Sequence, residues 1–152
     1  PGILWGHYQP ARIYFVQGKY EIPLEEINKE LEANPENLRS LYVRGLIYGY
    51  RGKIGDLALA QDDFRRFTEW ASKEWGGYND LAWVLSKQRK YQEAKEVILS
   101  AFIKIQEAKE NPWLWNSLGV AQLNLKEYAE AKTDFEKGLL RTIRWYDKNF
   151  PA

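Results

Sequence analysis

The chain has 152 residues, enough for a domain with a substantial core, and its 45% hydrophobic and 28% charged residues are typical of a globular protein. Its 22 basic and 21 acidic side chains give a formal charge of +1, so the composition carries no electrostatic signal for nucleic acid or an anionic membrane surface. The lack of Cys and the single His exclude disulfides and the usual zinc sites, and no apolar run reaches the ~18 residues of a membrane span.

The chain begins Pro1-Gly2-Ile3, with no initiator Met and without the layout of a signal peptide. We therefore expect a processed protein or a segment of a longer one. Its composition predicts a soluble chain. Whether its compartment is cytoplasmic, or extracytoplasmic after removal of a signal or anchor, is left open.

The first predicted helix pair covers approximately residues 4–36. Its leading helix contains Pro10 and is expected to be short. Pro23 stands where the other pairs have a small Ala, which a helix tolerates in its first turn. Asn34-Pro35 predicts the turn that ends the pair.

The second predicted pair covers approximately residues 38–72. Gly45 and Ala60 are the small residues that allow its two helices to approach closely. They are three residues further apart than the equivalent pair in the last unit. The Gly-containing segment 51–56 predicts an enlarged turn that accounts for the difference.

The third and fourth predicted pairs, approximately residues 75–109 and 112–145, repeat each other at an interval of thirty-seven residues, and a tail over 146–152 follows. The segment KYQEAK at 90–95 returns as EYAEAK at 127–132. Apolar residues in both pairs recur at three- and four-residue steps, which predicts helices. Self-similarity at a period of roughly 20–50 residues is typical of stacked-repeat architectures.

These units resemble the tetratricopeptide repeat. The resemblance rests on residues at the packing positions and on two Asn-Pro turns, namely Trp115, Leu118-Gly119, Tyr128, Ala131, Phe135, Asn34-Pro35 and Asn111-Pro112. It implies an all-α fold, a right-handed superhelix of antiparallel helix hairpins (a TPR-like α-solenoid), with residues 1–152 as a single domain. Two alternatives stay open. One is a non-repetitive helical bundle, and the other is a pentatricopeptide solenoid, which reads RNA and would favour a basic groove.

The resemblance also implies that the first helix of each pair lines a concave face. On those helices, outside the packing stripe, eight aromatic, basic or amide side chains form our predicted peptide-binding set: Arg39, Tyr42, Tyr50, Asn79, Trp83, Lys87, Trp113 and Asn116. Stiff aromatic side chains are enriched at binding hot spots, and an Asn amide offers a donor and an acceptor to an extended backbone. We expect Tyr78 and Trp115 in the core instead. A one-step error in helix phase would turn Trp83 and Trp113 inward. For Asn79 and Asn116 the alternative to binding is a solvated or helix-capping role.

Some family members grip chaperone C-termini with a clamp of Lys, Arg and Asn residues. At matching positions this chain has Tyr8, Tyr42, Val43 and Gly76, so we do not expect chaperone-tail binding.

No motif predicts catalysis. The glycines at 49–53 lack P-loop spacing, His7 has no evident Ser or Cys partner, and the adjacent acids Glu25-Glu26 and Asp62-Asp63 are interpreted as solvated helix surface. We therefore expect no enzyme activity, no catalytic, metal or cofactor site, and no nucleic-acid partner.

The predicted function is a protein-protein interaction module or scaffold that binds a partner polypeptide in its concave groove. Two alternatives stay open. Exposed aromatic residues could instead support self-association in a structural repeat protein. The repeats could also be an accessory segment of a larger enzyme.

Overall fold

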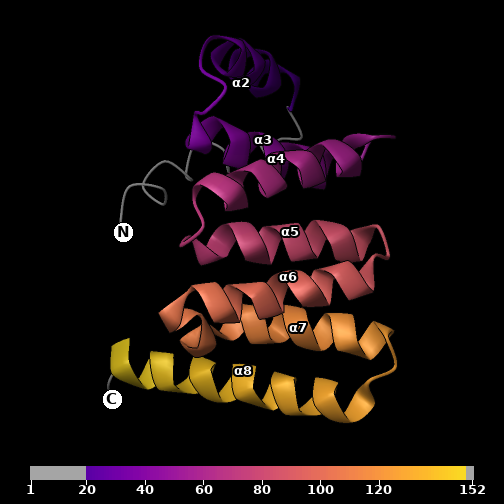
Figure 1. Ribbon diagram of the computed structural model, residues 1–152, viewed down its shortest axis with the longest axis vertical. Helices are drawn as coiled ribbons and strands as arrows, with labels where there is room; N and C mark the ends of the chain where they lie inside the picture. Colours follow the sequence, from indigo (N-terminus) through magenta and orange to yellow (C-terminus); the bar gives the residue numbers. More distant parts are fainter. Residues whose placement is uncertain (1–19, 150–152) are drawn as a thin grey trace. The chain divides into compact units, whose positions relative to one another are not determined.

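The computed structural model describes residues 20–149, so the leading helix expected for the first repeat and the last residues of the predicted tail lie outside the described residues. Between residues 20 and 149 all regular secondary structure is helical (Figure 1). The chain divides between Ala71 and Ser72 into two compact units, at the connection between the second and third predicted repeats. The prediction of one domain over residues 1–152 stays a prediction.

The first unit contains three described helices, α2 (Glu21–Ala33), α3 (Leu38–Arg51) and α4 (Asp56–Trp70). Pro23 lies in the first turn of α2, and a turn at 34–37 joins α2 to α3, both as the sequence predicted. Helices α3 and α4 pack against each other around fully buried aromatic and aliphatic side chains that include Leu41, Phe64 and Phe67.

The enlarged turn predicted between α3 and α4 is confirmed. Gly52 and Gly55 have φ of 68° and 88°, a region that glycine occupies without steric cost. The Asp56 carboxylate holds the turn closed, since it accepts hydrogen bonds from the Arg51 guanidinium at 2.7 and 2.8 Å and from the Lys53 backbone N–H at 2.9 Å.

The second unit contains α5 (Trp75–Lys87), α6 (Tyr91–Lys104), the 3₁₀ helix η1 (Gln106–Glu110), α7 (Pro112–Asn124) and α8 (Tyr128–Asn149). Its helices form the hairpins α5–α6 and α7–α8, with α7 packed on α6 (Figure 1). The Asn111 side chain caps α7 by accepting the backbone N–H groups of Trp113 and Leu114. The all-α fold of stacked antiparallel hairpins is confirmed.

Two features of the second unit differ from the sequence-based expectation. A tetratricopeptide repeat has a period of about 34 residues, and the longer interval here is accommodated by η1, whose Ala108 is buried together with the preceding Ile105. Helix α8 also continues to Asn149, beyond the end predicted for the fourth repeat at residue 145.

The core of the second unit follows the repeat pattern. Tyr78 is buried, as predicted, and Leu85, Ile98 and Leu114 are fully buried. Within residues 20–149, no helix is both long and apolar enough to cross a membrane.

Candidate functional site

The predicted binding residues of the first unit lie along α3, and they differ in their surroundings. Arg39 and Tyr50 are exposed, near opposite ends of the helix. Tyr42 is half-buried, because its ring contacts Phe64 in an edge-on arrangement at 5.7 Å between centroids and Phe67 at 5.0 Å. Tyr42 therefore contributes to the packing of α3 on α4, a role that helical spacing alone did not reveal.

In the second unit, α5 and α7 contact each other and place two indole rings together. The Trp75 and Trp113 rings are stacked, with centroids 6.1 Å apart and an angle of 23° between the planes. Trp113 nevertheless remains 54% exposed, so the pair offers an open aromatic surface. Trp75 was absent from the predicted set. Its signal in the sequence was its position beside Gly76, which is the repeat equivalent of Trp113.

The two predicted Asn residues occupy equivalent positions in the repeat but have different partners. Asn79 Oδ1 accepts a hydrogen bond from Ser117 Oγ at 2.8 Å, which links α5 to α7. Asn116 lies beside α8, since a Cβ atom added to Gly138 would come within 2.5 Å of Asn116 Oδ1. Asn79 therefore orders the contact between the two helices, whereas Asn116 marks the border with α8.

Further along α5, Trp83 and Lys87 are one turn apart, and the Lys87 ammonium lies 4.5 Å from the centre of the Trp83 ring. On α7, Val120 is exposed at the position equivalent to Trp83. We define the α5–α7 face by the side chains that recur every three or four residues on these two helices: Trp75, Asn79, Trp83, Lys87, Trp113, Ser117 and Val120. It combines aromatic and apolar contact area with an amide and a cation.

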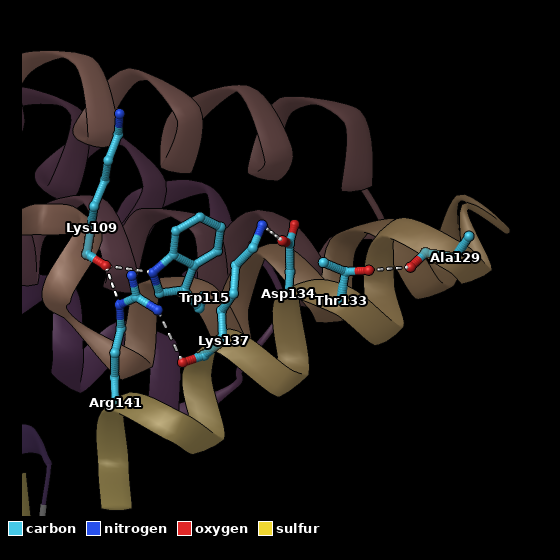
Figure 2. Close-up of polar contacts among 7 residues, drawn as sticks. All are labelled: Lys109, Trp115, Ala129, Thr133, Asp134, Lys137 and Arg141. Atoms are coloured by element: carbon cyan, nitrogen blue, oxygen red, sulfur yellow. Dashed lines mark hydrogen bonds and ion pairs between the residues drawn. The ribbon is translucent and has the colours of Figure 1, made fainter. Parts of the chain in front are cut away.

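Trp115, predicted in the core, is half-buried between α6, η1 and α8. Its indole N–H donates to the Lys109 carbonyl at 2.7 Å (Figure 2). The centre of its ring lies 4.5 Å from that of the Phe102 ring. On the α8 side, the Lys137 ammonium is 4.4 Å and the Arg141 guanidinium 5.3 Å from the ring centre. The indole N–H and the ring of Trp115 both have partners in the protein, which supports a structural role for Trp115.

The side chains around Trp115 hold each other in place (Figure 2). Arg141 also donates to the Lys109 carbonyl and, at 3.3 Å, to the Lys137 carbonyl, and Lys137 pairs with Asp134 at 2.7 Å. Lys109 lies in η1, the connection between α6 and α7. This connection therefore supplies the carbonyl oxygen that accepts hydrogen bonds from both Trp115 and Arg141.

A polar cluster in the first unit corrects one sequence interpretation. Asp63, interpreted as solvated surface, is buried and accepts two hydrogen bonds from the Arg44 guanidinium, at 2.7 and 2.8 Å. Arg44 also donates to Asn28 in α2 at 2.9 Å. Burial raises the pKa of Asp63 although the guanidinium acts in the opposite direction. A cavity of about 470 Å³ adjoins the pair. Asp62, which precedes Asp63 and also lines this cavity, is exposed.

Stacked helical hairpins that leave an ordered face open define the class of helical-repeat interaction scaffolds. Residues 114–141 match the family model of the tetratricopeptide repeat. This segment lies in the fourth predicted repeat, so the match agrees there with the resemblance that the repeat pattern indicated.

Two curated relatives carry the name photosystem I assembly protein Ycf3. That of Acaryochloris marina is 31% identical over 68 residues, which cover 45% of this chain and 41% of the relative. That of Synechococcus sp. is 33% identical over 88 residues, which cover 52% of this chain and 51% of the relative. The chain thus spans about half the length of the curated relatives it matches.

Solved structures share the fold. PilF from Pseudomonas aeruginosa superposes with a TM-score of 0.73 at 24% identity, covering 88% of this chain and 58% of PilF. A structure of MamA superposes with a TM-score of 0.71 at 17% identity, covering 86% of this chain and 72% of MamA. At these identities the likeness concerns the fold alone.

Proposed function

We propose that this protein is a non-enzymatic interaction module whose α5–α7 face binds an extended segment of a partner protein. The observation that carries the proposal is the stacked Trp75–Trp113 pair, which is fixed by ring packing and yet leaves Trp113 half exposed. Rigid aromatic side chains of this kind provide contact area at low cost in conformational entropy, and they dominate binding energy in protein interfaces.

The chemistry of the face suggests what it would recognise. Asn79, held by Ser117, lies between the tryptophan pair at one end and Trp83 with Lys87 at the other. We expect a segment with apolar side chains for the indoles and a carboxylate for the Lys87 ammonium. Its backbone would reach the Asn79 and Asn116 amides. The exposed residues Arg39 and Tyr50 of the first unit are further candidate contacts.

The names of the curated relatives and the composition of the chain fit a binding role. The curated relatives are named as assembly proteins, and a role in assembling a complex of other proteins fits a module of this kind. The nearly neutral charge favours protein over nucleic acid as the partner.

The test uses a random-peptide display library selected on the full chain. We expect the Kd of selected peptides to rise at least tenfold for Trp113→Ala and for Trp83→Ala, because truncation of a hot-spot aromatic typically costs about 2 kcal/mol or more. Trp145→Ala is the matched control, since Trp145 on α8 is exposed to a similar extent, 47%. A loss of peptide affinity in Trp145→Ala, but not in Trp113→Ala or Trp83→Ala, would reject the α5–α7 face as the binding site.

A further inference from the structure

The cavity beside the Arg44–Asp63 pair in the first unit carries a further inference. Its volume of about 470 Å³ lies within the range of roughly 300–1,000 Å³ that is typical of small-ligand pockets. Helices α3 and α4 supply its walls, and five of its lining residues are charged: Arg44, Asp62, Asp63, Arg65 and Arg66. Three guanidinium groups and two carboxylates therefore border one enclosed space.

The repeat pattern shows that the packing of a hairpin does not require the charged pair. Arg44 immediately precedes the small residue of its first helix, and in that place the next two repeats have Leu81 and Leu118, both buried. Asp63 lies three residues after the small residue of its second helix, where the third repeat has Val97. Apolar side chains are thus compatible with the fold at both positions.

Stability alone does not explain the pair. Arg44 donates to Asp63 at 2.7 and 2.8 Å and to Asn28 at 2.9 Å, so it joins three helices. Removing a guanidinium and a carboxylate from water is costly, and their attraction often does no more than offset that cost. Burial also raises the pKa of the Asp63 carboxyl, and groups perturbed in this way beside a cavity are typical of functional sites.

The hydrogen-bond donors of the cavity suit an oxyanion. An arginine presents five N–H groups in a planar fork that matches carboxylate and phosphate. Asp63 and Asn28 accept hydrogen bonds from three of these groups of Arg44. The Pro35 carbonyl accepts one from Arg66 at 2.9 Å. Both guanidinium groups therefore carry N–H donors beyond those that these bonds engage.

The charges of the lining favour an anion over a cation. Arg44 and Asp63 neutralise each other in their ion pair. Two guanidinium groups, those of Arg65 and Arg66, then stand against the single carboxylate of Asp62. The remaining formal charge is positive, and its attraction for an oxyanion is stronger at a partly enclosed site than in bulk water.

We infer that this cavity binds a small organic anion, a carboxylate or a phosphate monoester, whose oxygens accept hydrogen bonds from Arg44 and Arg66. The apolar body of the anion lies against Tyr48 and Leu59, which complete the lining. The inference is independent of the proposed role of the α5–α7 face, because every residue of this cavity belongs to the first unit.

The first experiment titrates phenyl phosphate and benzoate into the full chain and follows the backbone amide shifts of α3 and α4 by NMR. We expect saturable binding, with a Kd that rises about tenfold in Arg66→Gln because a charge-assisted hydrogen bond is lost. Asp62→Asn should lower the Kd several-fold, since it removes a like charge from the site. Arg89→Gln, at an exposed arginine outside the cavity, is the matched control and should leave the Kd unchanged.

The second experiment separates binding from packing. The double variant Arg44→Leu with Asp63→Val has the residues of the third repeat at both positions. We expect its Tm to equal or exceed that of the wild type, and neither probe to bind it. Arg44→Leu alone should lower Tm, because it leaves the buried Asp63 carboxylate without its guanidinium partner.

Four results would overturn the inference. The first is a lack of saturable binding of either probe to the wild type, and the second is a Kd that neither Arg66→Gln nor Asp62→Asn changes. The third is unchanged binding by the folded double variant, which would leave the ion pair a role in packing only. The fourth is tighter binding in Arg66→Gln with weaker binding in Asp62→Asn, which would assign the cavity to a cation. If the double variant does not fold, the two single variants still decide, since Asp62 is exposed and Arg66 is only half-buried.

Discussion

Arg89 and Lys126, thirty-seven residues apart, share the same left-handed backbone conformation, with φ of 60° and 64°. Each follows the first helix of its hairpin, and the next backbone N–H donates to the carbonyl of Leu85 or of Gln122, both at 2.9 Å. This conformation costs a residue other than glycine roughly 1–2 kcal/mol. Both hairpins of the second unit therefore contain the same strained position.

Replacing these residues with glycine should relieve the strain. We expect Arg89→Gly and Lys126→Gly each to raise the free energy of unfolding by about 0.5–1 kcal/mol, measured by urea denaturation. Lys90→Gly is the control, because Lys90 has φ of −87° and should lose about 0.5–1 kcal/mol through greater freedom of the unfolded chain. Destabilisation by all three variants would contradict the strain argument.

The repeat also identifies a weak point in the core. Gln122 is buried, and its Oε1 has no hydrogen-bond partner, whereas the equivalent residue of the preceding hairpin is the fully buried Leu85. We expect Gln122→Leu to stabilise the protein by about 1–2 kcal/mol, since it removes an unsatisfied buried acceptor. The reciprocal change, Leu85→Gln, should destabilise it. A neutral effect of Gln122→Leu in thermal unfolding would show that the acceptor is satisfied in solution.

Gly119 is required by the size of the residue opposite it. A Cβ atom at position 119 would lie 2.8–2.9 Å from three atoms of the Phe135 ring, which is too close for a rigid aromatic group. We expect Gly119→Ala to cost about 1–3 kcal/mol. The preceding hairpin has Ala82 and Ile98 at these positions, both buried. Adding Phe135→Ile to Gly119→Ala should therefore recover part of the loss, and a double-mutant cycle without favourable coupling would refute the steric explanation.

The pH dependence of stability should reveal the role of Asp56. The Arg51 guanidinium and the Lys53 N–H hold the pKa of this carboxyl below its ordinary value of 3.8. Its stabilising contribution is therefore complete above that value and is lost as the pH falls through the lower pKa of the folded state. We expect the stability difference between the wild type and Asp56→Asn to be constant from pH 7 to about 5 and to shrink below pH 4. Asp63, whose pKa is raised, is present in both proteins, so its effect cancels in this difference. A difference that grew on acidification would contradict the assignment.

Local features were predictable because short-range chemistry decides them. Pro23 could enter only a first helical turn, Asn111 could cap the helix that follows it, and the glycines at 52 and 55 allowed the enlarged turn. The spacing of small and aromatic residues further indicated which helices form hairpins.

Side-chain partners were less predictable, because they depend on neighbours distant in the sequence. Tyr42 was assigned to a binding face by its position on α3, but Phe64 and Phe67 on α4 lie within reach of its ring. Asp63 was interpreted as solvated, and only the approach of Arg44 from α3 shows why a charge can be buried there.

The sequence by itself determined that this protein is a stack of helical hairpins, because a 3.6-residue period and a repeat interval follow from residue spacing alone. The tertiary structure decided which equivalent residues have equivalent roles. Three pairs of residues are equivalent in the repeat: Asn79 and Asn116, Lys95 and Lys132, and Phe102 and Leu139. The first residue of each pair contacts a helix or turn of the following hairpin. Within residues 20–149 no such hairpin follows the second residue. A repeat pattern specifies one unit, whereas burial and pairing depend on the neighbour packed against it.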